Sequence, residues 1–298
     1  MSKTMNKSMG FIFAALAGAL WGVSGIIGQF LFEYKQIAPT WLVSYRMVIA
    51  GIILIVFLKI RKIDVMCVWK EKEDRNWLIL YAVAGMMMVQ FSFFKSIESS
   101  NSPTATVLQY LNPTMMLIFF ALKTRIMPAV NEWAAVGMGL LGTFMVATGG
   151  DVHTLKLSPL GLTWGLGCAI ITCIYTILPI RLLKKFDALI ICGWAMVIGG
   201  IVLCIITRPW TLAANVDIEV ILCMIILIIF GTIIPFSISL MAISVIGPVK
   251  SNLMSSIEPV VVAILGFFLF GLMFSIGELI GFALIIATIF VLAMNRNK

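Results

Sequence analysis

The sequence is poor in charged residues. Only 11% of its 298 residues are Asp, Glu, Lys or Arg, whereas 61% are hydrophobic and the mean hydropathy is +1.10. A soluble globular domain has about 25% charged residues, so this composition excludes that class. We therefore expect an all-α integral membrane protein, because helices satisfy their own backbone groups inside a bilayer.

Histidine is nearly absent, and the cysteines follow no metal-binding pattern. His153 is the single histidine of the sequence, and its six cysteines form no C-x-x-C pair. Zinc sites need clusters of Cys and His, and a histidine-based triad needs a positioned imidazole. The acids within the apolar runs form no acid/base pair. The sequence thus predicts no metal, no cofactor and no enzymatic activity.

Long apolar runs stand where charges are missing. A helix that spans a bilayer needs about 20 mostly apolar residues. Ten stretches meet this requirement, and we expect ten transmembrane helices at 10–32, 40–58, 76–98, 103–122, 132–148, 158–180, 187–207, 218–242, 249–270 and 275–294.

The cations are distributed unequally between the predicted loops. With a cytoplasmic N-terminus, fifteen Lys and Arg residues fall in cytoplasmic segments and three, Lys35, Lys156 and Arg208, fall outside. Cytoplasmic loops of membrane proteins carry such an excess. The net charge of +8 is therefore a topology signal and gives no reason to expect nucleic acid. We predict a multi-pass protein of the cell membrane with both termini and the 59–75 loop cytoplasmic and His153 external.

Internal matches divide the sequence into two halves. Gly18-Ala19-Leu20-Trp21-Gly22 and Gly161-Leu162-Thr163-Trp164-Gly165 both read G-x-x-W-G. Asn112-Pro113 corresponds to Glu258-Pro259, and Glu132 to Glu278, and a single shift in residue number relates both of these pairs. We call this shift, which carries Pro113 onto Pro259, the repeat offset. Such self-similarity predicts two homologous five-helix units, residues 1–150 and 151–298.

An odd number of helices per unit has a geometric consequence. The second unit must enter the membrane from the opposite side, so we expect inverted repeats related by a pseudo-two-fold axis in the membrane plane. Transporters of this kind bind their solute near the midplane, where helices are interrupted. Pro113 and Pro259 are candidates for these helix breaks, because proline removes a backbone donor.

Several motifs together resemble the EamA family of the drug/metabolite transporter superfamily. They are the two G-x-x-W-G motifs, Tyr45-Arg46, Leu108-Gln109-Tyr110-Leu111-Asn112-Pro113 and Ser256-Ile257-Glu258-Pro259. The resemblance covers nearly the whole chain and implies a secondary carrier of small metabolites, often an amino-acid exporter. The family often has a Gly-Glu pair after the fourth and ninth spans, where this sequence has Thr124-Arg125 and Gly271-Leu272.

Two charged residues inside the predicted spans are candidate solute ligands. Ionisable groups at the bilayer centre cost from about 2.5 to more than 10 kcal/mol and usually face a cavity. Glu258 is interpreted as a site for a substrate amine or a proton, with a structural contact as the alternative. Arg46 is suited to hold a carboxylate through two hydrogen bonds, with an anchoring role as the alternative.

Uncharged candidates complete the predicted site. Gln109 and Asn112 are three residues apart and can face one cavity. The tryptophans of the two repeats either line the cavity or anchor at the interface. The predicted lining is Trp21, Trp164, Gln90, Phe94, Gln109, Tyr110, Asn112 and Tyr175.

The remaining membrane-embedded charges receive structural interpretations. Lys95 and Glu98 are predicted to pair on one helix face. Glu132 and Glu278 begin helices, where the helix dipole favours a carboxylate. Lys250 is interpreted as a snorkelling or gate residue.

These patterns favour a secondary transporter that exports amino acids or related amine-bearing solutes by alternating access. A multidrug exporter of aromatic cations and a flippase of a lipid-linked head group remain alternatives. The expected partners are the solute, membrane lipids and, if transport is coupled, protons.

Overall fold

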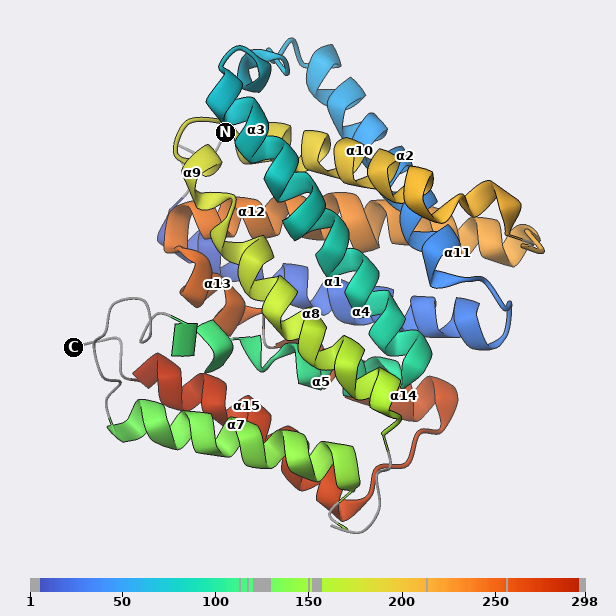
Figure 1. Ribbon diagram of the computed structural model, residues 1–298, viewed down its shortest axis with the longest axis vertical. Helices are drawn as coiled ribbons and strands as arrows, with labels where there is room; N and C mark the ends of the chain where they lie inside the picture. The colour runs from blue at the N-terminus through green and yellow to red at the C-terminus, as the bar shows by residue number, and fades with distance from the viewer. Residues whose placement is uncertain are drawn as a thin grey trace.

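The fold is a bundle of tilted helices that run back and forth between two ends (Figure 1). The computed structural model describes residues 6–112, 114–116, 118–119, 130–149, 151, 157–212, 214–255 and 257–294. Within these ranges no strand is formed. α1 begins and α15 ends on the same side of the bundle, at the left of Figure 1.

The helices follow the apolar runs. Their bounds are α1 Lys7–Glu33, α2 Pro39–Ile60, η2 Cys67–Trp69, α3 Lys72–Leu80, η3 Tyr81–Met87, α4 Met88–Ser99, α5 Ser102–Gln109, α7 Val130–Thr148, α8 Pro159–Ile177, α9 Ile180–Leu183, α10 Ala188–Thr207, η4 Pro209–Thr211, α11 Ile218–Ile228, η5 Ile229–Ile233, α12 Ile234–Ile246, α13 Pro248–Met254, α14 Ile257–Phe270 and α15 Ile276–Met294.

Seven helical stretches in the described ranges are long and apolar enough to cross a membrane. α7 and α15 contain shorter apolar segments, Trp133–Val146 and Ile276–Thr288. The predicted span at 103–122 is described in part, beginning with α5. The ten-helix count therefore stays a prediction, whereas the helical, multi-pass character is observed.

Helices of the first half pack mainly against helices of the second half. α2 packs on α10 and α7 on α15, which lie side by side along the lower edge of Figure 1. α1 packs on α12, and α4 packs on α8. These last two contacts correspond to each other, because each joins the first helix of one half to the third helix of the other. The core is therefore shared between the halves.

π-helical segments interrupt the same place in both halves. η3 covers Tyr81–Met87 and η5 covers Ile229–Ile233. By the repeat offset, positions 83–87 correspond to 229–233. Single π-helical turns are rare and occur often at functional sites. Each segment directly precedes a helix that lines the central cavity described below.

Glycines let α1 approach the second half closely. A Cβ atom on Gly18 would lie 2.3 Å from the Ser255 carbonyl oxygen, and one on Gly22 would lie 3.1 Å from Val261. Gly161 and Gly165 have the same role against Ser99 and Leu108. The repeated G-x-x-W-G motif is thus a helix-packing motif, as small residues at this spacing are in membranes.

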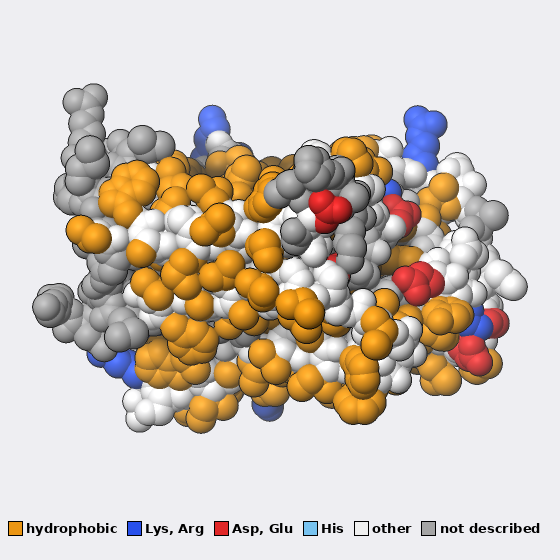
Figure 2. All heavy atoms as spheres, turned by 90° about the horizontal axis from the view of Figure 1, so that it is seen from below, with side chains coloured by type: hydrophobic (Ala, Val, Ile, Leu, Met, Phe, Trp, Pro, Cys, Tyr) orange, Lys and Arg blue, Asp and Glu red, His pale blue; other side chains and the backbone are white. Residues whose placement is uncertain are grey.

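The outer surface is largely apolar. Phe268, Leu140 and Ile276 are among many exposed hydrophobic side chains on the helices. On the face in Figure 2, hydrophobic side chains cover the central part, and the acidic side chains drawn gather toward the right-hand end, where α1 ends. A surface of this kind is stable when lipid covers it.

Candidate functional site

A small cavity lies where α1, α4, α8 and α12 meet the interrupted helix α13–α14. Water-molecule centres can occupy a volume of about 40 Å³ in it. One water needs about 10–15 Å³ by this measure, so the cavity has room for a few waters and is too small for a solute of amino-acid size. Its lining is Trp21, Ser24, Arg46, Val89, Gln90, Phe93, Phe94, Gln109, Tyr110, Asn112, Thr172, Tyr175, Phe236, Asn252, Ser255 and Glu258.

The interruption between α13 and α14 follows from Pro259. Proline has no N–H, so the carbonyl of Ser255, four residues earlier, lacks its normal helical donor. The Tyr110 hydroxyl, from the other half, donates to this carbonyl at 2.5 Å. The backbone N–H of Glu258 also donates to it, at 3.0 Å. The freed carbonyl is therefore satisfied inside the protein.

The first half has a corresponding break after α5. The carbonyl of Gln109 stands four residues before Pro113, which lies outside the described residues. The side-chain amide of Asn112 donates to this carbonyl at 3.1 Å. Asn252, from α13, donates to the Asn112 Oδ1 atom at 3.1 Å. Asn112 thus joins the two interrupted helices.

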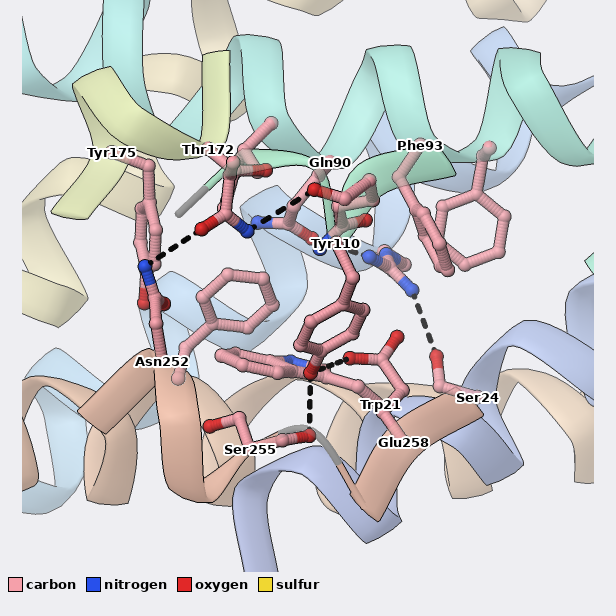
Figure 3. A pocket seen from close by; sticks show the side chains of 16 residues that line it. Trp21, Ser24, Gln90, Phe93, Tyr110, Thr172, Tyr175, Asn252, Ser255 and Glu258 are labelled. Atoms are coloured by element: carbon pink, nitrogen blue, oxygen red, sulfur yellow. Dashed lines mark hydrogen bonds between the residues drawn. The ribbon is translucent and has the colours of Figure 1, made fainter. Parts of the chain in front are cut away.

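Glu258 is buried beside this break, with 1% of its surface exposed. Its Oε2 atom lies 3.1 Å from the Tyr110 hydroxyl, so one hydroxyl contacts both Glu258 and Ser255 (Figure 3). No cationic side chain of the described residues lies within 4 Å of its carboxylate. Glu258 is therefore a buried acid without an ion-pair partner in this part of the chain.

Arg46 lines the same cavity and is 2% exposed. Its Nη2 atom donates to Gln90 Oε1 at 2.6 Å, and Nη1 contacts Ser24 Oγ at 3.4 Å. The guanidinium lies 4.3 Å from the centre of the Phe94 ring. No carboxylate of the described ranges lies within 4 Å of it. Neutral groups thus hold this buried cation and leave its charge uncompensated.

Three buried donors at the cavity lack acceptors. Arg46 Nε, Gln90 Nε2 and Trp21 Nε1 have no hydrogen-bond partner among the described residues. A buried donor without a partner loses about 1–3 kcal/mol. Because all three atoms are donors, the arrangement favours acceptor atoms such as water or carboxylate oxygens.

An aromatic wall closes one side of the cavity. The rings of Trp21 and Phe236 are 5.0 Å apart, and those of Phe236 and Tyr175 are 5.7 Å apart, both edge to face. Trp164 does not belong to this wall, because it packs on Phe91 at 5.6 Å and is absent from the cavity lining. The two repeated tryptophans therefore have different surroundings.

The structure brings nine of the ten predicted cavity residues together, Trp164 being the exception. Among the lining residues that sequence reasoning missed are Ser24, Phe236 and Asn252. Ser24 lies three residues after Trp21, on the same helix face. Phe236 is the repeat counterpart of Gln90, so the repeat offset would have identified it. Asn252 could have been identified because it is a polar amide in an otherwise apolar run.

Lys95, Glu98 and Glu278 have the structural roles that were expected. Lys95 is bonded to Glu98 on the face of α4. Glu278 accepts a hydrogen bond from the Ser275 backbone N–H at 2.7 Å at the start of α15, as a capping residue does. Lys250 is exposed near the start of α13, and its interpretation as a snorkelling or gate residue stays a prediction. The side chain of Glu132 lies outside the described part.

Comparisons with known proteins agree with this architecture. The model of the EamA-like transporter family matches residues 8–148 and 159–294. A curated protein of Salmonella typhimurium, the uncharacterized inner membrane transporter YicL, is 31% identical over 289 residues, which cover 97% of this chain and 96% of that protein. A solved crystal structure superposes with a TM-score of 0.69 at 16% identity, covering 98% of this chain and 99% of the other, and this likeness concerns the fold.

The two matched stretches leave out little besides the termini and the connection between the halves. They include every residue that lines the cavity. The chain is a multi-pass membrane transporter and belongs to the EamA-like transporter family.

Proposed function

We propose that this protein is a secondary transporter that exports an amino acid or a related amine-bearing solute by alternating access between inverted repeats. The observation that carries the proposal is the presence of Arg46 and Glu258 in one cavity, both buried and neither paired with an opposite charge in the described residues. Buried charges without partners are strongly unfavourable unless something compensates them. A zwitterionic solute supplies both missing charges.

When the cavity is wider than in this closed structure, its Arg46 side is suited to the carboxylate of such a solute. Guanidinium groups bind carboxylates with two parallel hydrogen bonds. The unpartnered donors Gln90 Nε2 and Trp21 Nε1 add further hydrogen bonds for the same oxygens. This side therefore supports an anionic group on the solute.

The amine of the solute fits the Glu258 side. A carboxylate in a closed, poorly hydrated cavity binds either an ammonium group or a proton, and these two cations exclude each other. Such competition exchanges solute for protons across the membrane. The local break at Ser255 gives the carboxylate access to the cavity.

An aromatic-cation exporter is the second candidate, because the Trp21–Phe236–Tyr175 wall lines the cavity together with Glu258. Aromatic faces attract organic cations. Arg46 opposes this function, since a cation without a carboxylate would be repelled by it. The zwitterion is therefore the better fit.

Solute flux into proteoliposomes, with and without an imposed pH gradient, tests the coupling role of Glu258. A thermal-shift screen of amino acids, polyamines, quaternary amines and sugars first selects the solute. Glu258→Gln keeps the shape and removes the titration, so the variant should insert and fold but lose the response to the gradient. Glu98→Gln, which also removes one carboxylate, is the matched control and should keep it.

A Glu258→Gln variant that responds to the gradient as the parent does would show that Glu258 is not the coupling site. If the parent itself shows no response, the carrier is facilitative. A screen in which only quaternary amines raise the melting temperature would favour the aromatic-cation exporter, and stabilisation by a lipid-linked head group alone would favour a flippase.

Arg46→Lys separates the two solute classes. Lysine keeps the positive charge but cannot make the two-pronged contact to a carboxylate. Loss of one charged hydrogen bond, about 1.5–3 kcal/mol, should weaken amino-acid binding by roughly ten-fold or more. Binding of a quaternary amine should change little, since it makes no hydrogen bond to Arg46.

A further inference from the structure

Two clusters of ion pairs tie the halves of the protein together at opposite ends of the bundle. In the first, Lys35 lies just after α1, and its Nζ atom is 2.6 Å from Asp217 Oδ2 and 2.5 Å from Glu219 Oε2. Asp217 caps α11, and Glu219 lies in its first turn. We call these three residues the Lys35 cluster.

The second group is the Arg181 cluster, formed by Arg181, Lys185, Glu71, Glu73 and Asp74. Arg181 in α9 lies 2.6 Å from Glu73 Oε1. Lys185 lies 2.9 Å from Asp74 Oδ2 and 3.3 Å from Glu71 Oε2. Glu71 is the N-cap of α3, and Glu73 lies in its first turn. In Figure 1, α3 and α9 are at the upper left, whereas α11 is at the right.

The three residues of the Lys35 cluster correspond to three residues of the Arg181 cluster. The repeat offset, which relates the two proline positions, also relates Lys35 to Arg181, Asp217 to Glu71 and Glu219 to Glu73. The Lys35–Glu219 contact of 2.5 Å thus has a counterpart in the Arg181–Glu73 contact of 2.6 Å. The sequence repeat has therefore preserved one ion pair between the halves at both ends of the bundle.

Each cluster connects to the cavity along one helix. In the first half, α3 carries Glu71, Glu73 and Asp74 at its start and continues through η3 into α4, where Gln90 and Phe93 line the cavity. In the second half, α11 continues through η5 into α12, where Phe236 lines it. A π-helical segment thus lies between each ion-pair cluster and the cavity. Such a segment is a suitable place for a helix to bend.

The helix on the other side of each ion-pair cluster also reaches the cavity. Lys35 follows α1, which contributes Trp21 and Ser24. Arg181 follows α8, which contributes Thr172 and Tyr175. Separation of α1 from α11 at one end, or of α8 from α3 at the other, would therefore open a route between these helices to the cavity. Both clusters are intact here, which agrees with the small volume of the cavity.

We propose that the Lys35 and Arg181 clusters are the two gates of the transporter, and that they open in turn. The inference rests on the proposed alternating access. With the predicted topology, the Lys35 cluster closes the external route and the Arg181 cluster closes the cytoplasmic one. A transporter whose halves exchange conformations needs equivalent closing contacts on both sides. These clusters meet that requirement through residues that the repeat relates.

The gates differ at two residues. Lys185 has Pro39 as its repeat counterpart, so the Lys35 cluster has no second cation. Asp74 is a buried carboxylate, 1% exposed, that both Lys185 and Arg181 approach, and its repeat counterpart is Val220. Removal of a cation from a buried carboxylate leaves an unpaired charge. Arg181 is therefore the better position to neutralise, because Lys185 still compensates Asp74 in that variant.

Cysteine accessibility tests the gates without knowledge of the solute. Val89 lines the cavity and takes no part in either cluster, so Val89→Cys reports entry from outside. The full-length protein, with its six native cysteines replaced, is labelled in intact cells with a membrane-impermeant maleimide. Lys35→Met should raise the labelling rate, and Arg181→Met should lower it, each by about two- to five-fold, the shift expected from loss of the ion-pair contacts that each cation makes.

Two other ion pairs provide matched controls, since each is formed within one segment. Lys70 lies 2.9 Å from Asp64 in the loop after α2, and Lys95 bonds Glu98 within α4. Lys70→Met and Lys95→Met should leave the rate unchanged. The charge exchanges Lys35→Glu with Glu219→Lys, and Arg181→Glu with Glu73→Arg, should restore the parental rate.

The proposal is overturned if Lys35→Met and Arg181→Met change labelling in the same direction, or if neither differs from the controls. If labelling fails in this way but the protein shows gradient-driven amino-acid flux, the proposed transport function is supported and the assignment of the gates is rejected. Opposite shifts in a protein that moves no amine-bearing solute would keep the gates and refute the proposed solute.

Discussion

Gly18→Ala should destabilise the protein, because Gly18 is the place where α1 comes closest to the interrupted helix. The added Cβ atom would lie 2.3 Å from the Ser255 carbonyl oxygen and 2.9 Å from the carbonyl carbon and Cα atom of Ser255. These atoms are backbone and cannot rotate away. An ordinary contact requires α1 or α13 to move by about 1 Å.

The movement disturbs contacts that Ser255 makes elsewhere. Its carbonyl accepts from Tyr110 at 2.5 Å, and its hydroxyl donates to the Ala14 carbonyl at 2.9 Å. Overpacking costs about 1–3 kcal/mol, and a weakened hydrogen bond adds about 0.5–1.5 kcal/mol. The better helix propensity of alanine returns about 0.5–1 kcal/mol. The net loss is therefore about 0.5–4 kcal/mol.

Gly167→Ala is the matched control, since a Cβ atom on Gly167 would have nothing within 4 Å. That variant keeps the propensity gain without the collision, so it should be as stable as the parent or slightly more stable. Thermal unfolding of the purified variants in one detergent gives the comparison. A Gly18→Ala protein that melts at or above the temperature of Gly167→Ala would refute the packing assigned to this glycine.

Three further predictions concern topology, the proline break and pH. With single cysteines placed at Lys72 or at Asn215, a reagent added from outside should label the cysteine at Asn215 alone. Labelling at Lys72 but not at Asn215 would show that the topology is the reverse of the predicted one. Pro259→Ala restores a donor that competes with the Tyr110 hydroxyl for the Ser255 carbonyl, so it should alter turnover or apparent affinity more than expression, and normal transport would mark the proline as a tolerated kink. The hydrogen bond from Lys35 holds the pKa of Asp217 below its ordinary value of 3.8, and the same contact raises the pKa of Lys35 above 10.5. The Lys35–Asp217 contact should therefore be fully present from about pH 5 to 9 and be lost as the pH falls through the lowered pKa of Asp217. The difference in melting temperature between Asp217→Asn and the parent should then be constant from about pH 5 to 9. A difference that varies within this range would contradict the assignment.

Much of the fold could be predicted from the sequence, because apolar length determines which segments enter a membrane. The boundaries were less accurate where charges begin a helix. The third span was expected at 76–98, whereas the helical stretch covers Lys72–Ser99. Its first turn contains Glu73 and Asp74, which a hydropathy pattern rejects but the helix dipole favours.

The cavity residues were also largely predictable, since polar and aromatic side chains are rare in apolar spans and are expected to face a common interior. Trp164 shows the limit of this reasoning. It occupies the same repeat position as Trp21, but it packs on Phe91 and not on the cavity wall. The repeat places both tryptophans at the same position in their own unit. Their surroundings differ, because the neighbouring residues from the other unit are different in the two cases.

The contacts between Lys35 and Asp217, or between Arg181 and Glu73, could not be predicted in the same way. Each partner lies outside the apolar core of a span, where charged residues are common and their partners depend on which helix ends meet. The structure supplies that pairing. Once it is known, the repeat offset shows that the two clusters are equivalent, which neither the sequence nor one contact alone would show.

The same cooperation between halves accounts for a glutamate and a proline inside an apolar helix. Pro259 frees the Ser255 carbonyl, and the hydroxyl that satisfies it belongs to Tyr110 of the first half. That hydroxyl also contacts Glu258. A displacement of α5 relative to α14 therefore changes the hydrogen bonding of the freed carbonyl and of the buried carboxylate together. The break is stable while the halves are closed around it, and its carboxylate responds when they move.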